Sequence, residues 1–522
     1  MDNEQSIKIT ILCTSDIHGT IYPIHYANNE PVEWGFSKIA TKIKMEKDRD
    51  PHLLLIDNGD LIQGSPLTYH YAQFLREQEQ PMVRLLNQLA YDAAVIGNHE
   101  FNYGLEFLEQ AINESKFPWL SANLLDSISG SPYFGKPYII KEVKTVKIAI
   151  LGITTHYIPN WEKAEHIQGI EFSDALQETK KWVSYIKENE KPDVLIVSYH
   201  GGFERDLGTG EPTEVLSGEN QGFAICQEIE GIDVLLTGHQ HRMLTGMING
   251  VEIIQPSFKG QAVGKVTLTL NKEKEIVAKN SDLLLVDDVE ADREVLQLAA
   301  LYEEKTQKWL DTPIGILDHD MLITDPLQVR IQDHPLIEFI NYVQMDVAGV
   351  EISNTALFDN SSPGFPKNVT MRDIVANYIY PNTLTVLRLT GHDIKAALEQ
   401  SASYFTIDQA GEIAVNPSFI EPKPQHYNYD MWEGIEYILD ISKPIGQRVT
   451  KLHFKGEPLH LDSTFDVVMN NYRATGGGNY MMFKDKPVVK EIPMDMSELI
   501  ANYIRKRKYI QASLNQNWKV IW

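Results

Sequence analysis

Short apolar runs bounded by turn residues recur through the first half of the chain. They cover residues 7–13, 52–56, 93–97, 147–153, 193–199, 233–238 and 251–255. Runs of about four to eight such residues are typical of buried strands. Segments with helical spacing of apolar residues lie between them, at 35–47, 104–116 and 174–190. This alternation predicts an α/β domain that extends to about residue 285.

The pattern changes after residue 286. Residues 287–313 are acidic, and their apolar positions suit one amphipathic helix: Val295, Leu296, Leu298, Leu301 and Leu310. From about residue 323, short strands alternate with clusters of Asn, Tyr and Gly, which indicates a smaller α+β domain. We therefore expect a first domain over 1–286, a helical linker over 287–322 and a second domain over 323–522.

Composition narrows the possible partners. The chain has 522 residues, with 72 acidic against 47 basic side chains and a net charge of −25. This charge opposes close approach to DNA, RNA or an anionic membrane, although a nuclease acting through bound metals stays possible. The acidic amino terminus lacks a basic segment and no apolar run reaches the roughly 18 residues of a membrane span, so we expect a cytoplasmic protein without a signal peptide.

Metal-binding residue types follow five of the predicted strands. The segments are "SDIHG" (15–19), "DNGD" (57–60), "GNHE" (97–100), "SYHGG" (198–202) and "TGHQH" (237–241). Side chains two apart in an extended segment point to the same side, so Asp16 with His18, and His239 with His241, are each expected to face one ion. Strand ends at one sheet edge are where α/β folds build their sites.

The candidate ligands are Asp16, His18, Asp60, Asn98, His200, His239 and His241. Seven donors exceed what one zinc ion takes, whereas two ions about 3.5–4 Å apart would share a bridging carboxylate, for which Asp60 is the candidate. Nitrogen and oxygen donors suit Zn²⁺, Mn²⁺, Fe²⁺ or Co²⁺. A lone histidine is more often an ordinary core or surface residue, but five at successive strand ends make that interpretation weak. Because neighbouring side chains diverge in an extended segment, Asn98 would face a metal and His99 the substrate.

These five motifs, in this order, resemble those of the calcineurin-like metallophosphoesterase superfamily. The resemblance implies a β-sandwich flanked by helices, with two metals at the strand ends. One metal would be held by Asp16, His18, Asp60 and His241, and the other by Asp60, Asn98, His200 and His239. The 5′-nucleotidase branch usually has Gln where this chain has His241, so this ligand departs from that branch.

The segment "NHEFNYGL" (98–105) resembles the 2′,3′-cyclic-nucleotide 2′-phosphodiesterase/3′-nucleotidase branch. Other 5′-nucleotidases tend to carry Asp where this chain has Asn102, which here would orient the catalytic His99. The similarity continues through 371–384, 426–449 and 470–480, and implies a 5′-nucleotidase-type second domain. In that family two aromatic rings clamp the base, and the matching positions are Tyr429 and Tyr472, although either tyrosine could be an ordinary core ring. Asn354, Asn382 and Arg473 are expected to contact phosphate or sugar.

The implied activity is hydrolysis of nucleoside 2′,3′-cyclic phosphates to 3′-nucleotides, and of 3′-nucleotides to nucleosides, by metal-activated water. A 5′-nucleotidase or nucleotide-sugar hydrolase is the alternative enzyme. A nucleotide sensor without catalysis is the alternative from another class. The resemblance also implies that the second domain swings about residues 287–312, while the oligomeric state stays open.

Overall fold

The computed structural model describes residues 6–522 apart from 215, 379, 381, 422 and 493. The first five residues, on which the expectation of no signal peptide partly rests, lie outside this range. The chain forms two compact units, one of Met1–His25 with Asn29–Thr306 and the other of Tyr26–Asn28 with Gln307–Trp522. The division falls within helix α7 (Arg293–Leu310). The expected boundaries at 286 and 322 stay a prediction.

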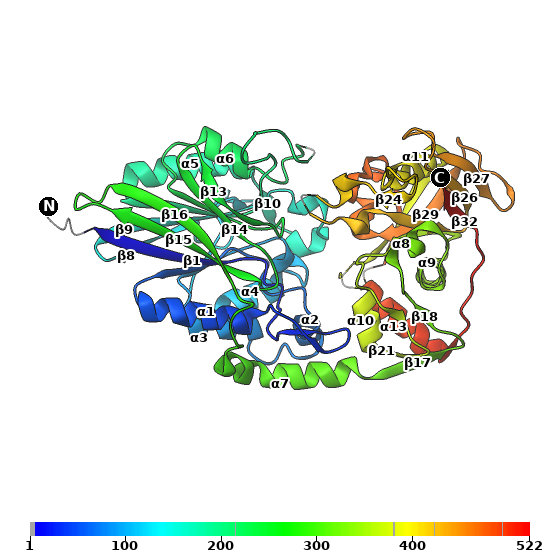
Figure 1. The fold of residues 1–522 in the computed structure, drawn as a ribbon, viewed down its shortest axis with the longest axis horizontal. Coiled ribbons are helices and arrows are strands. Elements are labelled where there is room, and N and C mark those ends of the chain that lie inside the picture. Colours follow the sequence, from blue (N-terminus) through cyan, green and yellow to red (C-terminus); the bar gives the residue numbers. More distant parts are fainter. Residues whose placement is uncertain (1–5, 215, 379, 381, 422, 493) are drawn as a thin grey trace. The chain divides into compact units, whose positions relative to one another are not determined.

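Two six-stranded sheets form the centre of the first unit (Figure 1). In spatial order the first sheet contains β16 (Ile276–Leu285), β15 (Ala262–Leu270), β1 (Ile7–Thr14), β4 (Leu54–Asp57), β5 (Ala93–Val95) and β6 (Trp119–Leu120). The second contains β13 (Met243–Ile248), β14 (Val251–Pro256), β12 (Val234–Thr237), β11 (Val194–His200), β9 (Val146–Thr154) and β8 (Tyr138–Val143). Strands β1, β4, β5 and β6 are parallel, as are β9, β11, β12 and β14.

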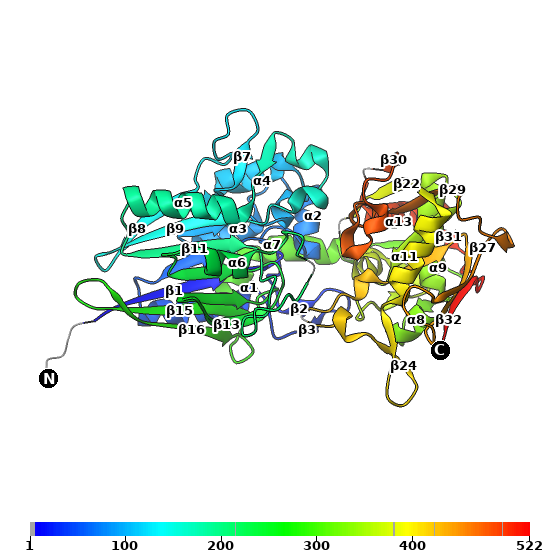
Figure 2. The ribbon, with the colours of Figure 1, turned by 90° about the horizontal axis from the view of Figure 1, so that it is seen from above.

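The two sheets pack face to face. Their inner faces share one core, in which Ile11 and Ile56 of the first sheet join Ile150 and Ile196 of the second. The outer face of the second sheet is covered by α5 (Ala175–Asn189) and α6 (Gly222–Glu228). Helices α1 (Phe36–Arg49), α2 (Pro66–Phe74), α3 (Pro81–Leu89) and α4 (Leu105–Glu114) lie on the side of the first sheet (Figures 1 and 2). The fold class predicted from the sequence, a β-sandwich flanked by helices, is confirmed.

Each apolar run singled out in the sequence forms a strand, because the alternative to pairing would leave buried backbone groups without partners. The runs at 7–13, 147–153 and 193–199 correspond to β1, β9 and β11. The antiparallel strands β15 and β16 were not predicted. In β15 buried and half-buried residues alternate, so it lacks the continuous apolar run of the parallel strands.

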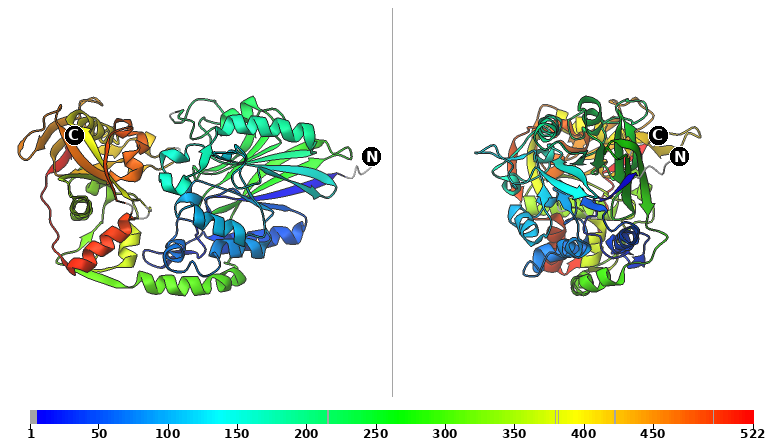
Figure 3. Two further views of the ribbon diagram at one scale, coloured as in Figure 1. Left: turned by 180° about the vertical axis from the view of Figure 1, so that it is seen from behind. Right: turned by 90° about the vertical axis from the view of Figure 1, so that its left-hand side faces the viewer.

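The second unit is built on a five-stranded sheet. Figure 3 shows the ribbon of this unit from two further sides. The order of the sheet is β25 (Asp430–Glu433), β19 (Ile352–Ala356), β29 (Thr464–Asn470), β22 (Leu384–Thr390) and β30 (Val488–Ile492). One cluster of apolar side chains joins this sheet to α9 (Pro335–Ala348), α10 (Met371–Asn377) and α13 (Met496–Arg507). Another joins it to α11 (Gly391–Ala402) and to a sheet of β28 (Glu457–Pro458), β27 (Val449–Phe454), β26 (Glu436–Asp440) and β32 (Trp518–Ile521). This is the α+β domain expected from the sequence.

A third sheet of this unit places the residues that follow α7. It contains β21 (Asn368–Thr370), β17 (Pro313–Leu317) and β31 (Tyr509–Ile510). Short helices α8 (Pro326–Ile331) and α12 (Asn471–Ala474) complete the elements used below. Among the helices in the described part of the chain, none combines the length and the apolar character that crossing a bilayer requires.

Candidate metal centre

All seven predicted metal ligands gather at the carboxyl ends of strands from both sheets. Asp16, Asp60 and Asn98 follow β1, β4 and β5 of the first sheet. His200 is the last residue of β11, and His239 follows β12 of the second sheet. Because the inner strands of each sheet run parallel, their ends meet at one edge of the sandwich.

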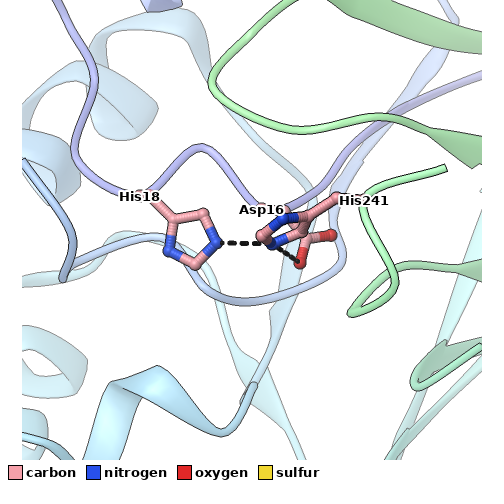
Figure 4. Close-up of side chains that lie close together, drawn as sticks. All are labelled: Asp16, His18 and His241. Atoms are coloured by element: carbon pink, nitrogen blue, oxygen red, sulfur yellow. Dashed lines mark hydrogen bonds and ion pairs between the residues drawn. The ribbon is translucent and has the colours of Figure 1, made fainter. Parts of the chain in front are cut away.

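Two groups of ligands are separated within this edge. In the first, Nε2 of His18 lies 3.0 Å from Nε2 of His241, which lies 3.6 Å from Oδ1 of Asp16 (Figure 4). In the second, Nε2 of His200 lies 3.2 Å from Oδ2 of Asp60. His239 joins this group, since its donor atom, that of His200 and that of Asp60 all lie within 4.8 Å of one another. Nε2 of His18 is 4.0 Å from Oδ2 of Asp60, so Asp60 stands between the two groups.

The side-chain oxygen of Asn98 lies beside the rings of His200 and His239, so Asn98 belongs to the second group. Oδ1 of Asn98 is 3.1 Å from Nε2 of His200 and 2.9 Å from Nδ1 of His239. An uncharged oxygen thus completes a set of donors without adding negative charge.

The backbone around the ligands is not extended, and this corrects the geometric reason given from the sequence. Five ligands have a positive φ, between 51° and 66°: Asp16, His18, Asp60, His239 and His241. This left-handed region costs non-glycine residues about 1–3 kcal/mol each and is concentrated at functional sites. Asp16 and His18 do approach the same place, but the turn after β1 brings them there, and not the two-residue period of a strand. The expectation that His239 and His241 face one ion is wrong, because His241 lies with Asp16 and His18 whereas His239 lies with Asp60 and His200.

Asn98 and His99 also lie in a helical turn. Asn98 has φ −75° and ψ −34°, and His99 begins the 3₁₀ turn His99–Phe101. The different directions of the Asn98 and His99 side chains are therefore not explained by the alternation of neighbouring side chains in a strand. His99 donates its backbone N–H to Oδ1 of Asp60 over 2.8 Å, and its Nε2 lies 4.0 Å from Oδ2 of the same residue. The ring of His99 thus borders the ligands.

Hydrogen bonds on the outer nitrogens of three histidine rings decide which nitrogens face the centre without a proton. Nδ1 of His18 donates to the carbonyl of Gln63, Nδ1 of His200 to that of Asn58, and Nε2 of His239 to the carboxylate of Glu219. A neutral imidazole has one N–H, so the opposite nitrogen of each ring presents a lone pair. These lone pairs converge with the oxygens of Asp60 and Asn98. Converging acceptors repel unless cations lie among them, so the residues fit a metal centre.

Burial makes the charges of this cluster interdependent. Burial lowers the pKa of His18 to about 3, which keeps that ring neutral and available as a ligand. At His200 burial opposes the charge, but the adjacent carboxylate of Asp60 outweighs it and raises the pKa to about 10. Burial raises the pKa of Asp16. The cluster therefore attracts positive charge, which a proton supplies when no metal does.

Two glycines leave room for the carboxylate ligands at the centre. A Cβ atom on Gly238 would lie 2.2 Å from Oγ of Ser15 and 2.6 Å from Oδ2 of Asp16. A Cβ atom on Gly97 would lie 2.4 Å from Oδ1 of Asp60. Any side chain at either position would displace a carboxylate ligand.

Three carboxylates that support the centre were missed in the sequence. Buried Glu100 accepts the backbone N–H groups of Asp60, Leu61 and Gly97, and so holds the loop of the bridging candidate. Glu219 accepts from His239, whose ring also stacks on Trp161 at 5.4 Å. Glu162 accepts from Nδ2 of Asn102 over 2.6 Å. Glu100 belongs to the "GNHE" motif and could have been found there, whereas Glu162 and Glu219 lie in segments without a recognisable motif.

Tyr429 of the second unit does not lie where the sequence expectation placed it. Its side chain is 0% exposed and packs against Tyr404 and Phe405, with its hydroxyl donating to the carbonyl of Arg330. A ring without exposed surface offers no face to a base, so Tyr429 is a core residue in this structure. Tyr427, which was not predicted, is half-buried and lies 6.5 Å from Tyr472 between ring centroids.

Arg473 is part of a buried ion pair. Its guanidinium contacts Asp430 with Nε and Nη2, at 2.8 and 3.0 Å, and both side chains are 1% exposed. It also donates to the carbonyl of Tyr427. Its donors therefore hold the loops that carry Tyr427 and Tyr472 together, and the expected contact with phosphate finds no support in this arrangement.

The two remaining predicted contacts differ in burial. Asn354 on β19 is 1% exposed, and neither polar atom of its side chain has a hydrogen-bond partner among the described residues. Asn382 is half-buried, and its carbonyl accepts the N–H of Met496. An unpaired buried amide is costly, but Asn354 offers almost no surface to a ligand, whereas Asn382 is accessible.

Comparison with known families covers both units. Residues 9–243 match the model of the calcineurin-like phosphoesterases, and residues 313–485 match that of the 5′-nucleotidase C-terminal domain. A candidate 5′-nucleotidase from Staphylococcus aureus, crystallised with alpha-ketoglutarate, superimposes with a TM-score of 0.92 and 35% identity. That match covers 99% of this chain and 100% of the other.

Two curated relatives have described activities. A 2′,3′-cyclic-nucleotide 2′-phosphodiesterase/3′-nucleotidase from Haemophilus influenzae is 28% identical over 99% of this chain and 88% of its own. A trifunctional nucleotide phosphoesterase from Bacillus subtilis is 26% identical over 98% of this chain, which spans only 39% of that longer protein.

Both units, their order along the chain and the full-length similarity at 35% identity agree with one assignment. The protein belongs to the calcineurin-like phosphoesterases that carry a 5′-nucleotidase C-terminal domain.

Proposed function

We propose that the protein is a two-metal phosphoesterase that opens nucleoside 2′,3′-cyclic phosphates to 3′-nucleotides and then hydrolyses these to nucleosides. The observation that carries the proposal is the convergence of histidine nitrogens with the carboxylates of Asp16 and Asp60, beside the ring of His99. The relatives named for this double activity, at 28% identity, support the choice of substrate.

In the proposal one metal is held by Asp16, His18, Asp60 and His241, and the other by Asp60, Asn98, His200 and His239. The grouping of Asp16 with His18 and His241, and of Asp60 with His200 and His239, supports this division, and a third group of His18, Asp60 and His99 places the ring of His99 against both. When bound, divalent cations of this family supply Lewis-acid polarisation of the phosphate oxygens and lower the pKa of the attacking water. The elements Mn, Zn, Fe and Co all suit the donors.

His99 is the proposed catalytic acid. Its Nδ1–H donates to Oδ1 of Asn102 over 2.7 Å and its Nε2 faces the cluster, so the ring acts as an acid in the doubly protonated form, in which Nε2 carries the proton that is transferred. From there the ring would stabilise charge on the leaving oxygen or protonate it, which in other enzymes contributes about 10²–10⁴-fold to the rate. With a cyclic phosphate the leaving oxygen is that of the 2′ carbon, so a 3′-nucleotide is released.

In the second unit we propose that Tyr472 stacks on the base, with Tyr427 in the place expected for Tyr429. Stacking tolerates different bases because every base offers a π face. Asn354 and Asn382 stay the proposed polar contacts to the nucleotide, and Arg473 is proposed to act by holding both tyrosine loops.

The test is a comparison of kcat/KM for 2′,3′-cyclic AMP, 3′-AMP and 5′-AMP with metal-loaded protein. The proposal expects the first two to be preferred. Preference for 5′-AMP would instead identify a 5′-nucleotidase, which the similarity to the Staphylococcus aureus structure favours as the second candidate. No hydrolysis of these nucleotides, of a nucleotide sugar or of bis(p-nitrophenyl) phosphate with Mn²⁺ would favour a nucleotide sensor.

A further inference from the structure

A chain of three side chains, His99, Asn102 and Glu162, leads from the metal centre to a buried carboxylate. Oδ1 of Asn102 faces Nδ1 of His99 at 2.7 Å, and Nδ2 of Asn102 donates to Oε2 of Glu162 over 2.6 Å. The other oxygen of Glu162 accepts from Nδ1 of His166 at 2.8 Å and from the N–H of Lys163 at 2.9 Å. The side chain of Glu162 is 6% exposed, so these bonds are largely shielded from water.

The direction of these hydrogen bonds determines how His99 is held. An ionised carboxylate only accepts, so Glu162 requires the NH₂ group of Asn102 to face it. The amide oxygen must then face His99, whose Nδ1 carries the proton of that bond. A free asparagine could turn over and present its NH₂ group to the imidazole, which would favour the opposite tautomer. Glu162 removes that choice.

The same geometry explains why position 102 carries an amide. An aspartate there would place a carboxylate oxygen 2.6 Å from Oε2 of Glu162, in a site with little water to screen the repulsion. We propose that Glu162 is a positioning residue, which through Asn102 fixes the orientation of His99 and keeps an acceptor against its Nδ1–H, so that the ring can also hold the transferable proton on Nε2. The pair formed by Asn102 and Glu162 thus does with a remote carboxylate what an aspartate beside the histidine would do directly.

The proposal predicts that the two residues can exchange chemical groups. In the double variant Asn102→Asp/Glu162→Gln, the new carboxylate accepts from His99 and from the NH₂ group that the second substitution introduces. The oxygen of the new glutamine still accepts from Lys163 and His166. Every bond is restored, with the donor and acceptor exchanged only between positions 102 and 162. In Asn102→Asp alone two carboxylates oppose each other. In Glu162→Gln alone, either the glutamine NH₂ group meets another donor or the Asn102 amide turns over and presents its NH₂ group to Nδ1 of His99.

The experiment is a double-mutant cycle on the full chain loaded with Mn²⁺, using bis(p-nitrophenyl) phosphate. We expect each single variant to lose about 10-fold or more in kcat with KM within about 2-fold, and the double variant to recover most of the loss. The melting temperature is a second readout, expected to fall in Asn102→Asp and to return in the double variant. Glu165→Gln, which changes an exposed glutamate of the same segment, is the matched control and should behave as wild type.

The proposal would be overturned if the effects of the two substitutions were independent, so that the losses multiplied in kcat and added in melting temperature. A wild-type kcat in both single variants would also overturn it. If the double variant does not fold, Glu162→Ala replaces Glu162→Gln. Asn102→Asp should then cost less when combined with Glu162→Ala than alone, because the opposing carboxylate is gone. The kcat comparison rests on the proposed function, whereas the melting temperatures of the four proteins do not. If the wild-type protein had no phosphoesterase activity, the proposed function would be refuted, and the melting temperatures would still test the coupling between positions 102 and 162.

Discussion

Nε2 of His200 and Oδ2 of Asp60 lie 3.2 Å apart, and they join the two sheets of the sandwich at the ends of β11 and β4. Nδ1 of His200 already donates to the carbonyl of Asn58, so a neutral His200 would face the carboxylate with a lone pair. Only a proton or a metal between the two makes the contact attractive. The arrangement therefore has consequences for metal content, catalysis and stability.

Asp60→Asn should strip the protein of metal, because the amide keeps the shape of the bridging candidate and removes its charge. We expect metal per chain, measured by elemental analysis after purification without chelator, to fall by at least half. Asp48→Asn, at an exposed position, is the control. A wild-type metal content in Asp60→Asn would contradict the bridging role.

Chelation should lower the melting temperature of the wild-type protein, since a metal that binds only the folded state stabilises it by mass action. At a free metal concentration about 100 times Kd this contribution is about 2.7 kcal/mol. Scanning calorimetry with and without EDTA measures it. Asp60→Asn should no longer respond to EDTA, and an equal response in this variant would place the stabilising ion elsewhere.

His99→Ala should separate catalysis from metal binding. The ring borders the ligands without belonging to either proposed set, so both metals should stay bound while kcat falls about 10²–10⁴-fold. Steady-state kinetics and elemental analysis on the same preparation measure the two effects. His52→Ala, at an exposed position, should change neither. A His99→Ala variant with wild-type turnover would remove the acid from the mechanism.

Tyr472→Ala should weaken nucleotide binding without affecting substrates that have no base. Loss of one stacking partner worth about 1–3 kcal/mol corresponds to a rise of roughly 5- to 150-fold in KM for 3′-AMP. The KM for bis(p-nitrophenyl) phosphate should stay unchanged. Tyr429→Phe is the matched control: it removes the hydroxyl that donates to Arg330, so it should lower stability by about 1 kcal/mol and leave the KM for nucleotides as it is. A KM for nucleotides that is raised in Tyr429→Phe and unchanged in Tyr472→Ala would contradict the assignment of Tyr472 as the stacking ring and Tyr429 as a core residue.

Glu433→Gln should flatten the dependence of stability on pH. Burial raises the pKa of Glu433 to about 7, from an ordinary value of 4.5, and nearby Glu338 and Asp333 add to the rise. The folded state therefore holds a proton that the unfolded state releases. The resulting stability is complete below about pH 4.5 and is lost as the pH rises through 7.

Over this window the wild-type protein should lose up to about 3 kcal/mol of unfolding free energy from this group. Glutamine keeps the acceptor oxygen for Asn515 and does not titrate, so the variant should be the more stable protein at pH 8. Urea denaturation at about pH 5 and pH 8 checks this, with Glu412→Gln at an exposed position as control. Equal slopes in wild type and Glu433→Gln would refute the shift.

Much of the fold could be predicted from the sequence, because parallel strands buried on both faces need continuous apolar runs. Strands β1, β9 and β11 were found in this way, and so were Asp16 and His200 at their ends. The antiparallel strands β15 and β16 were missed, because one half-exposed face interrupts the run. Local sequence thus determined where the inner strands end and which chemical groups stand there.

Only the tertiary structure decided how those groups are aimed. The positive φ of Asp16, the donation from His239 to Glu219 and the burial of Tyr429 all depend on segments distant in the chain. Asn102 illustrates the difference: the sequence shows an amide three residues after His99, but its direction is set by Glu162, sixty residues later. Hydrogen-bond direction and burial are properties of packed neighbours, and a one-dimensional pattern does not contain them.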